Sequence, residues 1–369
     1  MLRLDADPEE RTVANPRVVV VGATGAVGGR LLTVLEERNF PMARLRLTAS
    51  RRSVGTPLVY AGETILVEEA TQDIFDECDI AFIAANDDVS SEMAQAARER
   101  RCVAIDKSGA WRMRDDVPLV VPEVNAFDLD WHTGIIATPN CSTTPLVMVL
   151  DALSKANPVK RAIAATYQSV SGTGRAAMDE LQDQSRDLLE GGKAHPQQYP
   201  YQIAFNLLPQ IGSFNESGYA SEEVKMLEET RKMLHQKDLP VSATCVRVPV
   251  SVCHSEAVNI ELERPMSPSE ARDLLGRYPG IIVVDDPSAR AYPMPIGVEG
   301  SDEVFVGRIR KDEALPNGLA MWLVSDNLRK GAATNAVQIA EEVLNRGLWG
   351  KNHELWQKNT SKTLAAAAV

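Results

Sequence analysis

The chain has 369 residues, which is too long for one ordinary domain and enough for two domains, each with its own core. Hydrophobic residues make up 44% and charged residues 24%, as in soluble globular proteins, and no apolar run approaches the ~18–20 residues of a membrane span. The formal net charge of −12 disfavours nucleic acid as a partner, because phosphate binding requires clustered lysine and arginine.

The N-terminal residues 1–16 are polar and acidic, so we predict a flexible extension without the apolar core of a secretory signal. The expected location is therefore the cytoplasm. The five cysteines have no regular spacing, which argues against a disulfide framework, and no Cys-x-x-Cys pair suggests zinc. We expect no metal site and mostly buried, reduced cysteines.

The N-terminal part of the chain alternates between strand and helix patterns. The β-branched run at residues 17–21 is typical of a buried parallel strand, and a helix is predicted from residue 29 to about residue 38. Further strands are predicted at residues 43–49, 79–84 and 102–105, with a helix at residues 90–101. This alternation, with short connections, predicts a doubly wound parallel sheet.

After about residue 157 the pattern changes. Strands are predicted at residues 162–170, 241–252, 256–262 and 304–309, the last three in one sheet. Helices are predicted at residues 175–189, 221–235 and 328 to about 345, and residues 191–209 read as a proline-containing loop.

Three glycines, Gly22, Gly25 and Gly28, follow the first predicted strand and open the first helix. Glycines allow a tight turn and close approach to a pyrophosphate, and the helix N-terminus offers free N–H groups and a positive dipole end. The position directly after a strand favours dinucleotide binding over a merely structural turn.

The end of the second predicted strand distinguishes between the two nicotinamide cofactors. NAD-binding proteins usually place an acidic residue there to hold the ribose hydroxyls. Here the sequence is TASRRS at residues 48–53, without an acid. Hydroxyl and guanidinium groups suit a 2′-phosphate, so we predict NADP, with a solvated basic turn as the alternative.

The segment PNCST at residues 139–143 precedes the apolar stretch LVMVLDAL, which places Cys141 near a predicted helix N-terminus. There the dipole lowers a thiol pKa and N–H groups can hold an oxyanion. A thiolate could attack an aldehyde, and loss of hydride to a nicotinamide would then yield a thioester. From spacing alone, an ordinary cysteine at a helix start fits equally well.

A thiol nucleophile needs a base that titrates near neutral pH, usually a histidine. The chain has five candidates: His132, His195, His235, His254 and His353. His254 directly follows Cys253, but partners of this kind meet in space, and the residues alone do not distinguish His254 from a structural histidine.

Several charged residues could hold an anionic substrate. Arg112 follows the loop DKSGAW, and Arg247 lies in the otherwise apolar predicted strand at residues 241–252, where it needs a partner or a ligand. Glu222 and Lys225 lie three residues apart on one face of a predicted helix, where a surface ion pair is an equally good interpretation.

In this order the motifs resemble the aspartate-semialdehyde dehydrogenase family, over nearly all of residues 17–350. Matching segments include GATGAVG at 22–28, PNCST at 139–143, TYQSVSGTG at 166–174 and VSATCVRVPVSVCHSE at 241–256. The resemblance implies NADPH-dependent conversion of L-aspartyl 4-phosphate to L-aspartate 4-semialdehyde through a cysteine thioester, a step toward lysine, threonine, methionine and diaminopimelate. The alternatives are a paralogous reductase of a related acyl phosphate and a non-catalytic NADP-binding regulator.

The resemblance also implies roles for individual residues. The implied catalytic residues are the nucleophile Cys141, the general acid/base His254, and Gln168, which would orient the acyl group. The implied substrate-binding residues are Arg247 at the α-carboxylate, Glu222 at the amino group, and Arg112, Asn140 and Lys225 at the phosphate. The implied cofactor-binding residues are Gly22, Thr24, Gly25, Ala26, Val27, Ser50, Arg52, Ser171, Gly172 and Asn327.

Two segments depart from the family pattern. Residues 85–88 read ANDD where the family usually has a small Gly/Ser turn near the nicotinamide ribose. Residues 107–109 read KSG where the family commonly has Asn-Ser/Thr-Ser, and Lys107 either adds a phosphate contact or points to solvent. Both changes leave room for a related acyl-phosphate substrate.

The expected fold class is α/β, with a Rossmann-like NADP-binding domain and an α+β catalytic and dimerisation domain. The predicted units are a flexible extension (1–16), the NADP-binding domain (17–140), the catalytic and dimerisation domain (141–325), a C-terminal helix returning to the NADP-binding domain (326–350) and a tail (351–369). The expected partners are the substrate and inorganic phosphate, without a nucleic acid or a membrane, in a homodimer or homotetramer.

Overall fold

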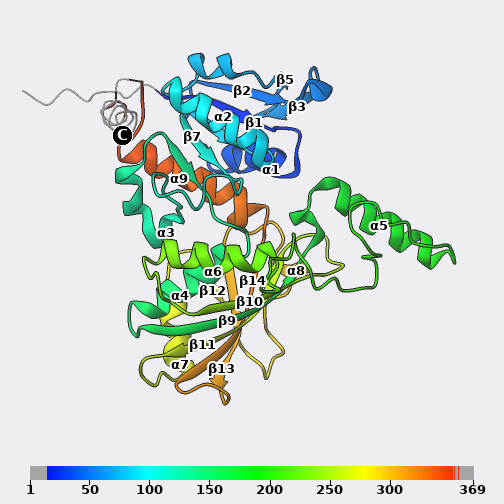
Figure 1. Cartoon of the computed structure of the whole chain (residues 1–369), viewed down its shortest axis with the longest axis vertical. Coiled ribbons are helices and arrows are strands. Elements are labelled where there is room, and N and C mark those ends of the chain that lie inside the picture. Colours follow the sequence, from blue (N-terminus) through cyan, green and yellow to red (C-terminus); the bar gives the residue numbers. More distant parts are fainter. Residues whose placement is uncertain (1–14, 352, 354–355, 357–369) are drawn as a thin grey trace, which may run out of the picture.

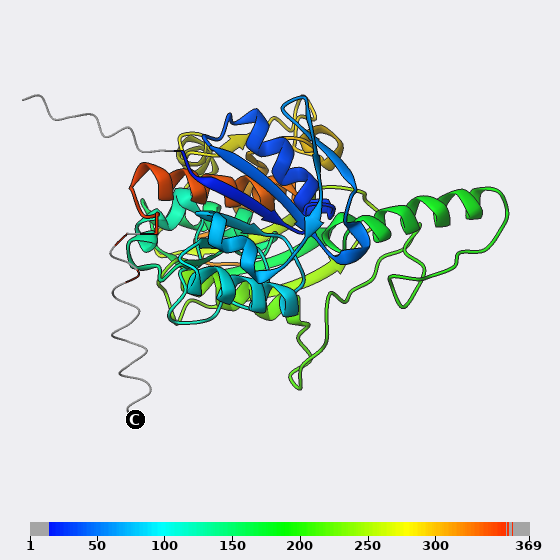
Figure 2. The same cartoon turned by 90° about the horizontal axis from the view of Figure 1, so that it is seen from above.

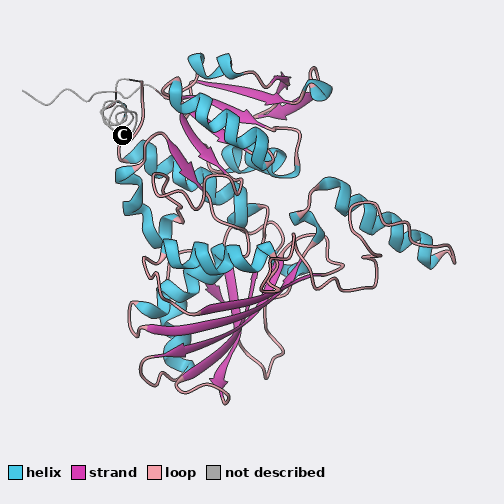
Figure 3. Ribbon diagram, in the orientation of Figure 1, coloured by secondary structure: helices cyan, strands magenta, loops and turns pink. Residues whose placement is uncertain are grey.

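The computed structural model describes residues 15–351, 353 and 356. The extension predicted for residues 1–16 and the tail predicted for residues 351–369 therefore lie almost entirely outside the described residues. Within them, two large sheets lie one above the other in Figure 1, and Figure 3 shows the same arrangement by secondary structure. Helices cover both sheets, in agreement with the predicted α/β class.

The first sheet is parallel throughout, with the strand order β5-β2-β1-β6-β7-β8. Its strands are β1 (Arg17–Val21), β2 (Arg44–Ala49), β5 (Glu68–Glu69), β6 (Ile80–Ile83), β7 (Val103–Asp106) and β8 (Ile135–Ala137). Every residue of β6 and β7 is buried, because helices cover both faces of a parallel sheet. The predicted doubly wound sheet is confirmed, while the hairpin of β3 (Pro57–Tyr60) and β4 (Glu63–Leu66) was not predicted.

Three helices pack on the first sheet: α1 (Ala26–Glu37), α2 (Asp87–Glu99) and the C-terminal α9 (Thr334–Asn345). Helix α9 contacts both α1 and β7, so the last part of the chain lies beside the first. The predicted helix at residues 328–345 begins with a π-helical turn at Arg329–Ala333 in place of a regular α-helical turn.

The second sheet is mixed, with the order β10-β9-β11-β14-β13-β12. Its strands are β9 (Val159–Gln168), β10 (Val241–Arg247), β11 (His254–Leu262), β12 (Ile281–Val283), β13 (Val304–Asp312) and β14 (Gly318–Ser325). The prediction of one sheet for the strands near residues 241, 256 and 304 is confirmed. The strand predicted at residues 241–252 is too long, because the chain turns after Arg247, with Cys253 at a φ of 73°.

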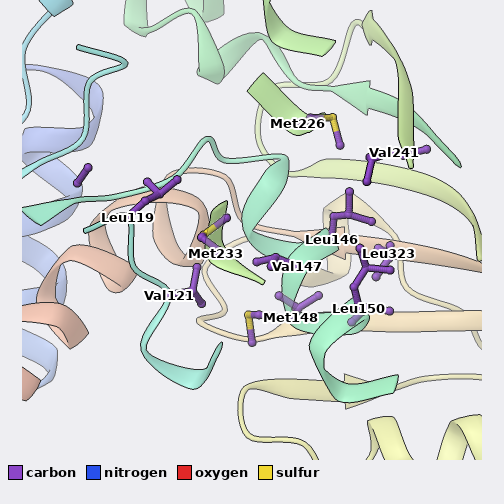
Figure 4. Close-up of a cluster of buried hydrophobic side chains, with 14 of the residues drawn as sticks. Leu119, Val121, Leu146, Val147, Met148, Leu150, Met226, Met233, Val241 and Leu323 are labelled. Carbon is purple, nitrogen blue, oxygen red and sulfur yellow. The ribbon is translucent and has the colours of Figure 1, made fainter. Parts of the chain in front are cut away.

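Helices α4 (Thr143–Ser154), α6 (Ser221–Met233) and α7 (Pro268–Leu275) contact the second sheet. Figure 4 shows α4 in the middle of the core, where Leu146 and Leu150 lie near Leu323 of β14, while Met226 of α6 lies near Val241 of β10. The same cluster of buried side chains includes Val19 of the first sheet, so α4 packs between the two sheets. The residues just before α4 are therefore at the junction of the two halves.

Two further helices are α3 (Pro122–Asn125) and α8 (Pro295–Val298). Helix α5 (Arg175–Leu189) and the loop after it project from the body, as Figure 2 shows. Within the described residues, no helix is long and apolar enough to cross a membrane, and no group of His, Cys, Asp and Glu could hold a metal ion. The five cysteines are free thiols, and four of them are buried.

Candidate active site

Cys141 lies in the turn between β8 and α4, at the junction of the two sheets. The Asn140 side chain fixes this turn, because its Oδ1 accepts a hydrogen bond of 2.7 Å from the backbone N of Ser142, the N-cap of α4. The π-helical turn packs closely against Cys141, since a Cβ placed on Gly331 would lie 2.9 Å from the Cβ of Cys141. The nucleophile candidate is thus held between two buried elements, at a helix N-terminus whose dipole favours an anion.

His254, the first residue of β11, is the partner of Cys141. Its Nε2 lies 3.2 Å from the Cys141 Sγ. Its Nδ1 accepts a hydrogen bond of 3.0 Å from the backbone N of Ser169. A backbone N–H can only donate a hydrogen bond, so Nδ1 of the neutral ring must be the acceptor. The ring proton is therefore on Nε2, directed at the Cys141 sulfur.

The Ser169 hydroxyl gives the ring a partner that can change its role. Its Oγ lies 3.1 Å from His254 Nδ1 and also 3.1 Å from the Oδ1 of Asn327, to which it can donate. When the ring gains a second proton, Ser169 Oγ can accept from Nδ1 while it donates to Asn327. A lone backbone N–H would leave that proton without an acceptor.

Burial favours the neutral form of both groups. Burial lowers the pKa of His254 to about 3, and repulsion from Arg247 adds to the effect. Burial raises the pKa of the Cys141 thiol to about 12, with Glu222 adding to it and Arg247 and Arg112 opposing it. The charges of a bound substrate would therefore change the protonation of this pair.

A cavity of about 620 Å³ opens beside Cys141. Its wall includes Arg112, Asn140, Glu222, Lys225 and Arg247, the five predicted substrate-binding residues. The structure therefore brings together residues from a loop, from the turn before α4, from α6 and from β10.

Arg247 is buried, and its Nη1 donates to the carbonyl of Ser169 at 2.7 Å. Its Nε is buried without a hydrogen-bond partner, and no carboxylate forms an ion pair with it among the described residues. A buried guanidinium without a counter-charge is suited to a substrate carboxylate.

Gln168 and Glu222 form one buried polar unit. The Gln168 Nε2 donates to Glu222 Oε1 at 3.0 Å, and the Gln168 Oε1 accepts from Thr166 at 2.9 Å. Although burial acts to raise the pKa of Glu222, Lys225 and hydrogen bonds from Asn140 and Gln168 hold it below its usual value. Glu222 is therefore an anion that can pair with an ammonium group. Gln168 contacts the cavity-lining Glu222 but is not itself among the described residues that line the cavity.

Glu229 is a functional candidate that the sequence analysis missed. Its side chain is buried, with Oε1 at 2.9 Å from Arg112 Nη1 and Oε2 accepting at 2.6 Å from the backbone N of Asn140. It therefore ties Arg112, a predicted phosphate-binding residue, to the turn that carries Cys141. Glu229 follows Glu222 by seven residues, about two helical turns, and this spacing on α6 could have revealed it. Ser169 and Gly331 were also missed.

The glycine loop fits the predicted dinucleotide site. Gly22 has a φ of +84°, and a Cβ on Gly28 would lie 2.1 Å from the Gly22 carbonyl oxygen, so the loop can close tightly only without side chains at these positions. The Gly22 N–H donates to the Thr48 carbonyl at 2.8 Å, which holds the loop against the end of β2. Arg52, just beyond β2, is exposed and has no ion pair with any described residue, so it is available for a phosphate.

The predicted cofactor residues fall into two groups. Four of them line the cavity beside Cys141: Val27, Ser171, Gly172 and Asn327. Others lie at the carboxyl ends of β1 and β2, outside that cavity wall: Gly22, Thr24, Gly25, Ala26, Ser50 and Arg52. This distribution fits an elongated ligand that runs from the glycine loop to the cysteine.

The two segments that depart from the family pattern touch each other. Asn86 is the N-cap of α2, with its Oδ1 accepting from the Val89 N–H at 3.0 Å. The carboxylate of Asp87 accepts from the Gly109 N–H at 2.9 Å. The acidic turn and the Lys107–Gly109 segment are thus one structural unit at the cavity rim.

Residues 17–132 match the family model described as semialdehyde dehydrogenase, NAD binding domain, and residues 150–330 match the model described as semialdehyde dehydrogenase, dimerisation domain. A relative from Aquifex aeolicus named aspartate-semialdehyde dehydrogenase is 51% identical over 337 residues, covering 90% of this chain and 99% of the relative. The chain belongs to the aspartate-semialdehyde dehydrogenase family. A Bacillus subtilis relative of the same name is 47% identical over 334 residues, or 88% of this chain and 96% of that relative.

Solved structures of aspartate-semialdehyde dehydrogenases share this fold. The Vibrio cholerae enzyme II, described as complexed with ASA, superposes with a TM-score of 0.88 at 40% identity, covering 90% of this chain and 98% of the other. The Candida albicans enzyme, described as containing NADP, has a TM-score of 0.69 at 26% identity, covering 89% of this chain and 98% of the other. The predicted family and the predicted pairing of a Rossmann-like domain with an α+β domain are confirmed.

Proposed function

We propose that this chain reduces L-aspartyl 4-phosphate to L-aspartate 4-semialdehyde with NADPH, through a thioester on Cys141. The observation that carries the proposal is the Cys141–His254 pair at 3.2 Å, beside a cavity whose wall includes the cationic side chains of Arg112, Lys225 and Arg247. The substrate is inferred from the names of the relatives, and the chemical steps are inferred from the residues around Cys141.

In the first step the Cys141 thiol passes its proton to His254, 3.2 Å away, and the resulting thiolate attacks the acyl carbon. The C–S bond forms as the C–O bond to phosphate breaks, and the electron pair leaves with the phosphate. Arg112 and Lys225 stabilise the charge that develops on this leaving group. Arg247 holds the α-carboxylate and Glu222 the ammonium group, so the acyl carbon is fixed opposite the sulfur.

The second step converts the thioester into the aldehyde. When bound, NADPH supplies a hydride to the thioester carbon. The oxyanion that forms then expels the thiolate, and a protonated His254 provides the proton that the departing group needs. Binding of the substrate carboxylate to Arg247 favours that protonation, because it cancels the repulsion that Arg247 exerts on the ring.

The cofactor part of the proposal is NADP rather than NAD. The end of β2 is followed by Ser50 and by Arg52, which forms no ion pair with a described residue. No acidic residue stands at residues 48–53 to hold free ribose hydroxyls. The N-terminus of α1 faces the glycine loop and suits a pyrophosphate.

The test is phosphate-dependent formation of NADPH from L-aspartate 4-semialdehyde and NADP, followed by absorbance. We expect rapid turnover that disappears without phosphate, and Cys141→Ala should abolish turnover while NADP binding survives. Full activity in Cys141→Ala would rule out the thioester route. No turnover by folded, NADP-binding protein would favour a paralogous reductase. Glutamate- and succinate-type semialdehydes would then be the substrates to test.

A cytoplasmic location and a homodimer or homotetramer complete the proposal. The five free thiols fit a reducing compartment. The model that matches residues 150–330 describes a dimerisation domain, and the second sheet has a partly exposed face that can serve as the interface.

A further inference from the structure

The wall of the cavity beside Cys141 includes one cationic side chain that no described residue binds. Arg112 pairs with Glu229 at 2.9 Å, and Lys225 pairs with Glu222 at 3.6 Å. Arg247 donates to a carbonyl. Lys107 also lines the cavity, but within the part of the chain that the structure describes, its ammonium group has neither a hydrogen bond nor an ion pair.

The acids nearest to Lys107 in the sequence are already engaged elsewhere. Asp106 accepts from the N–H of Ser108 at 3.0 Å and from its hydroxyl at 2.6 Å. Asp87 accepts from the N–H of Gly109 at 2.9 Å. Neither forms an ion pair with Lys107, so the positive charge is left for whatever enters the cavity.

Lys107 lies next to the predicted phosphate residues. Its carbonyl oxygen accepts a hydrogen bond of 2.6 Å from Arg112 Nη2, which keeps the two residues adjacent at the end of β7. Burial lowers the pKa of Lys107, and repulsion from Arg112 adds to this, while the Cys141 thiolate would oppose it. Two adjacent cations, one of them without a counter-charge, are suited to a ligand with more than one negative charge.

We propose that Lys107 binds the phosphate group of the substrate and completes the subsite formed by Arg112, Asn140 and Lys225. This inference rests on the proposed function, which supplies an acyl phosphate in one direction and inorganic phosphate in the other. Because Arg112 and Lys225 each have a carboxylate partner, Lys107 provides the uncompensated charge that matches the second negative charge of a phosphate dianion. In the reductive direction it stabilises the phosphate as the C–O bond breaks.

The first experiment needs no substrate and so does not depend on the proposed reaction. Inorganic phosphate bound beside Cys141 should slow alkylation of the thiol by iodoacetamide, and the phosphate concentration that gives half-protection measures the Kd. In Lys107→Gln this concentration should rise roughly tenfold, as expected for loss of a hydrogen bond to a charged group. Lys107→Arg should stay within about threefold of the native protein.

The matched charge control is Lys311→Gln. The Lys311 side chain is 69% exposed and lies far from the site. Lys311 of β13 is opposite Leu319, near the start of β14, whereas His254 of β11 is opposite Ser325, at the other end of β14. This variant also loses one positive charge, but half-protection should occur at the native phosphate concentration. An equal rise in Lys311→Gln and Lys107→Gln would reveal a general charge effect and overturn the proposal.

The second experiment uses steady-state turnover. In Lys107→Gln, the KM for phosphate should rise roughly tenfold, while the KM values for NADP and the semialdehyde change less than about twofold. A rise confined to the KM for NADP, or slower alkylation without phosphate at an unchanged phosphate Kd, would overturn the proposal. Absence of turnover in the native protein would count against the proposed function, and the protection experiment would still decide the role of Lys107.

Discussion

At the scale of single residues, the Ser169 hydroxyl is the group expected to adjust the pKa of His254, the proposed general acid/base. It is the partner of Nδ1 that can switch from donor to acceptor, since the second partner is a backbone N–H at 3.0 Å. Ser169→Ala should therefore lower the pKa of His254 in the working complex and lower kcat about tenfold, with the KM values unchanged.

The pH dependence gives the sign of this effect. A step that needs the imidazolium is fully available below the His254 pKa and is lost as pH rises through it. In Ser169→Ala that loss should occur at lower pH in the reductive direction, and Ser169→Thr, which restores a hydroxyl, should return the profile toward the native one. A pH–rate profile of Ser169→Ala that overlays the native curve would show that the hydroxyl has no such role.

Gly331 is expected to position the nucleophile by its lack of a side chain. A Cβ there would lie 2.9 Å from the Cβ and 3.2 Å from the Cα of Cys141, and both elements are buried. Gly331→Ala should displace Cys141 and lower kcat by about a hundredfold, because the reaction is sensitive to displacements of ~1 Å. The Kd for NADP, measured by fluorescence, should change little.

The control for this variant is Gly297→Ala, because a Cβ on Gly297 meets no atom within 4 Å. Its kcat should equal that of the native protein. A native kcat in Gly331→Ala would mean that the π-helical turn yields without moving the cysteine.

The residues that could be predicted from sequence are those that belong to a local motif. Cys141 and the glycine loop lie beside a predicted strand or helix, which gave a physical reason to select them. Arg247 stood out as an arginine in an otherwise apolar predicted strand, but its role came from the resemblance. The choice of His254 among five histidines, and of Glu222 as more than half of a surface ion pair, also came from the resemblance. The backbone N–H and the hydroxyl of Ser169 meet His254 from the turn that follows β9, and such a contact leaves no pattern in one sequence.

At the scale of elements, the packing of α9 and the π-helical turn against the N-terminal half of the chain depends on a buried ion pair. Lys330 Nζ lies 2.7 Å from Glu123 Oε2 of α3 and also donates to Asn335 and Gln338. Lys330→Met should cost about 3–5 kcal/mol in the free energy of unfolding, since it leaves a buried carboxylate without its partner. The double variant with Glu123→Leu should lose less than Lys330→Met alone.

Acid denaturation provides the check on this pair. Although burial acts to raise the pKa of Glu123, Lys330 holds it below its usual value. The stabilisation by this carboxylate is therefore present above the usual glutamate pKa and is lost as pH falls through the lowered value. The free energies of unfolding in urea of the native protein and the double variant should converge as the pH falls through the lowered pKa of Glu123, and a constant difference would contradict this assignment.

Helices and strands whose hydrophobic residues repeat at a regular spacing were predicted well. Elements whose conformation or place in a sheet depends on distant contacts were not. The strand at residues 17–21 and the helix at residues 175–189 have the predicted bounds. Strand β14 was not predicted, although it lies between β11 and β13, because its apolar run does not show which strands flank it. The π-helical turn was read as α-helix, since its geometry depends on burying Arg329 and Lys330 beside their acidic partners.

At the scale of the whole molecule, the second sheet has one face covered by helices and one partly open. Along β9, Ala162 and Ala164 are buried, whereas Ile163 is 44% and Tyr167 39% exposed. Tyr167 packs against Trp322 of β14, with ring centroids 5.4 Å apart, so an apolar strip crosses the open face. Such a strip on a domain of this kind is suited to a second copy of the chain.

Ile163→Glu should therefore convert the assembly to monomers. A charge introduced on the open face would be buried without a partner at the interface, and the dimer Kd should rise about a hundredfold or more. Light scattering coupled to gel filtration would measure the mass. The matched control is Leu189→Glu, because Leu189 is 79% exposed at the end of the projecting helix α5. If Leu189→Glu dissociates the assembly and Ile163→Glu does not, the projecting helix α5 forms the interface and the open face of the second sheet does not.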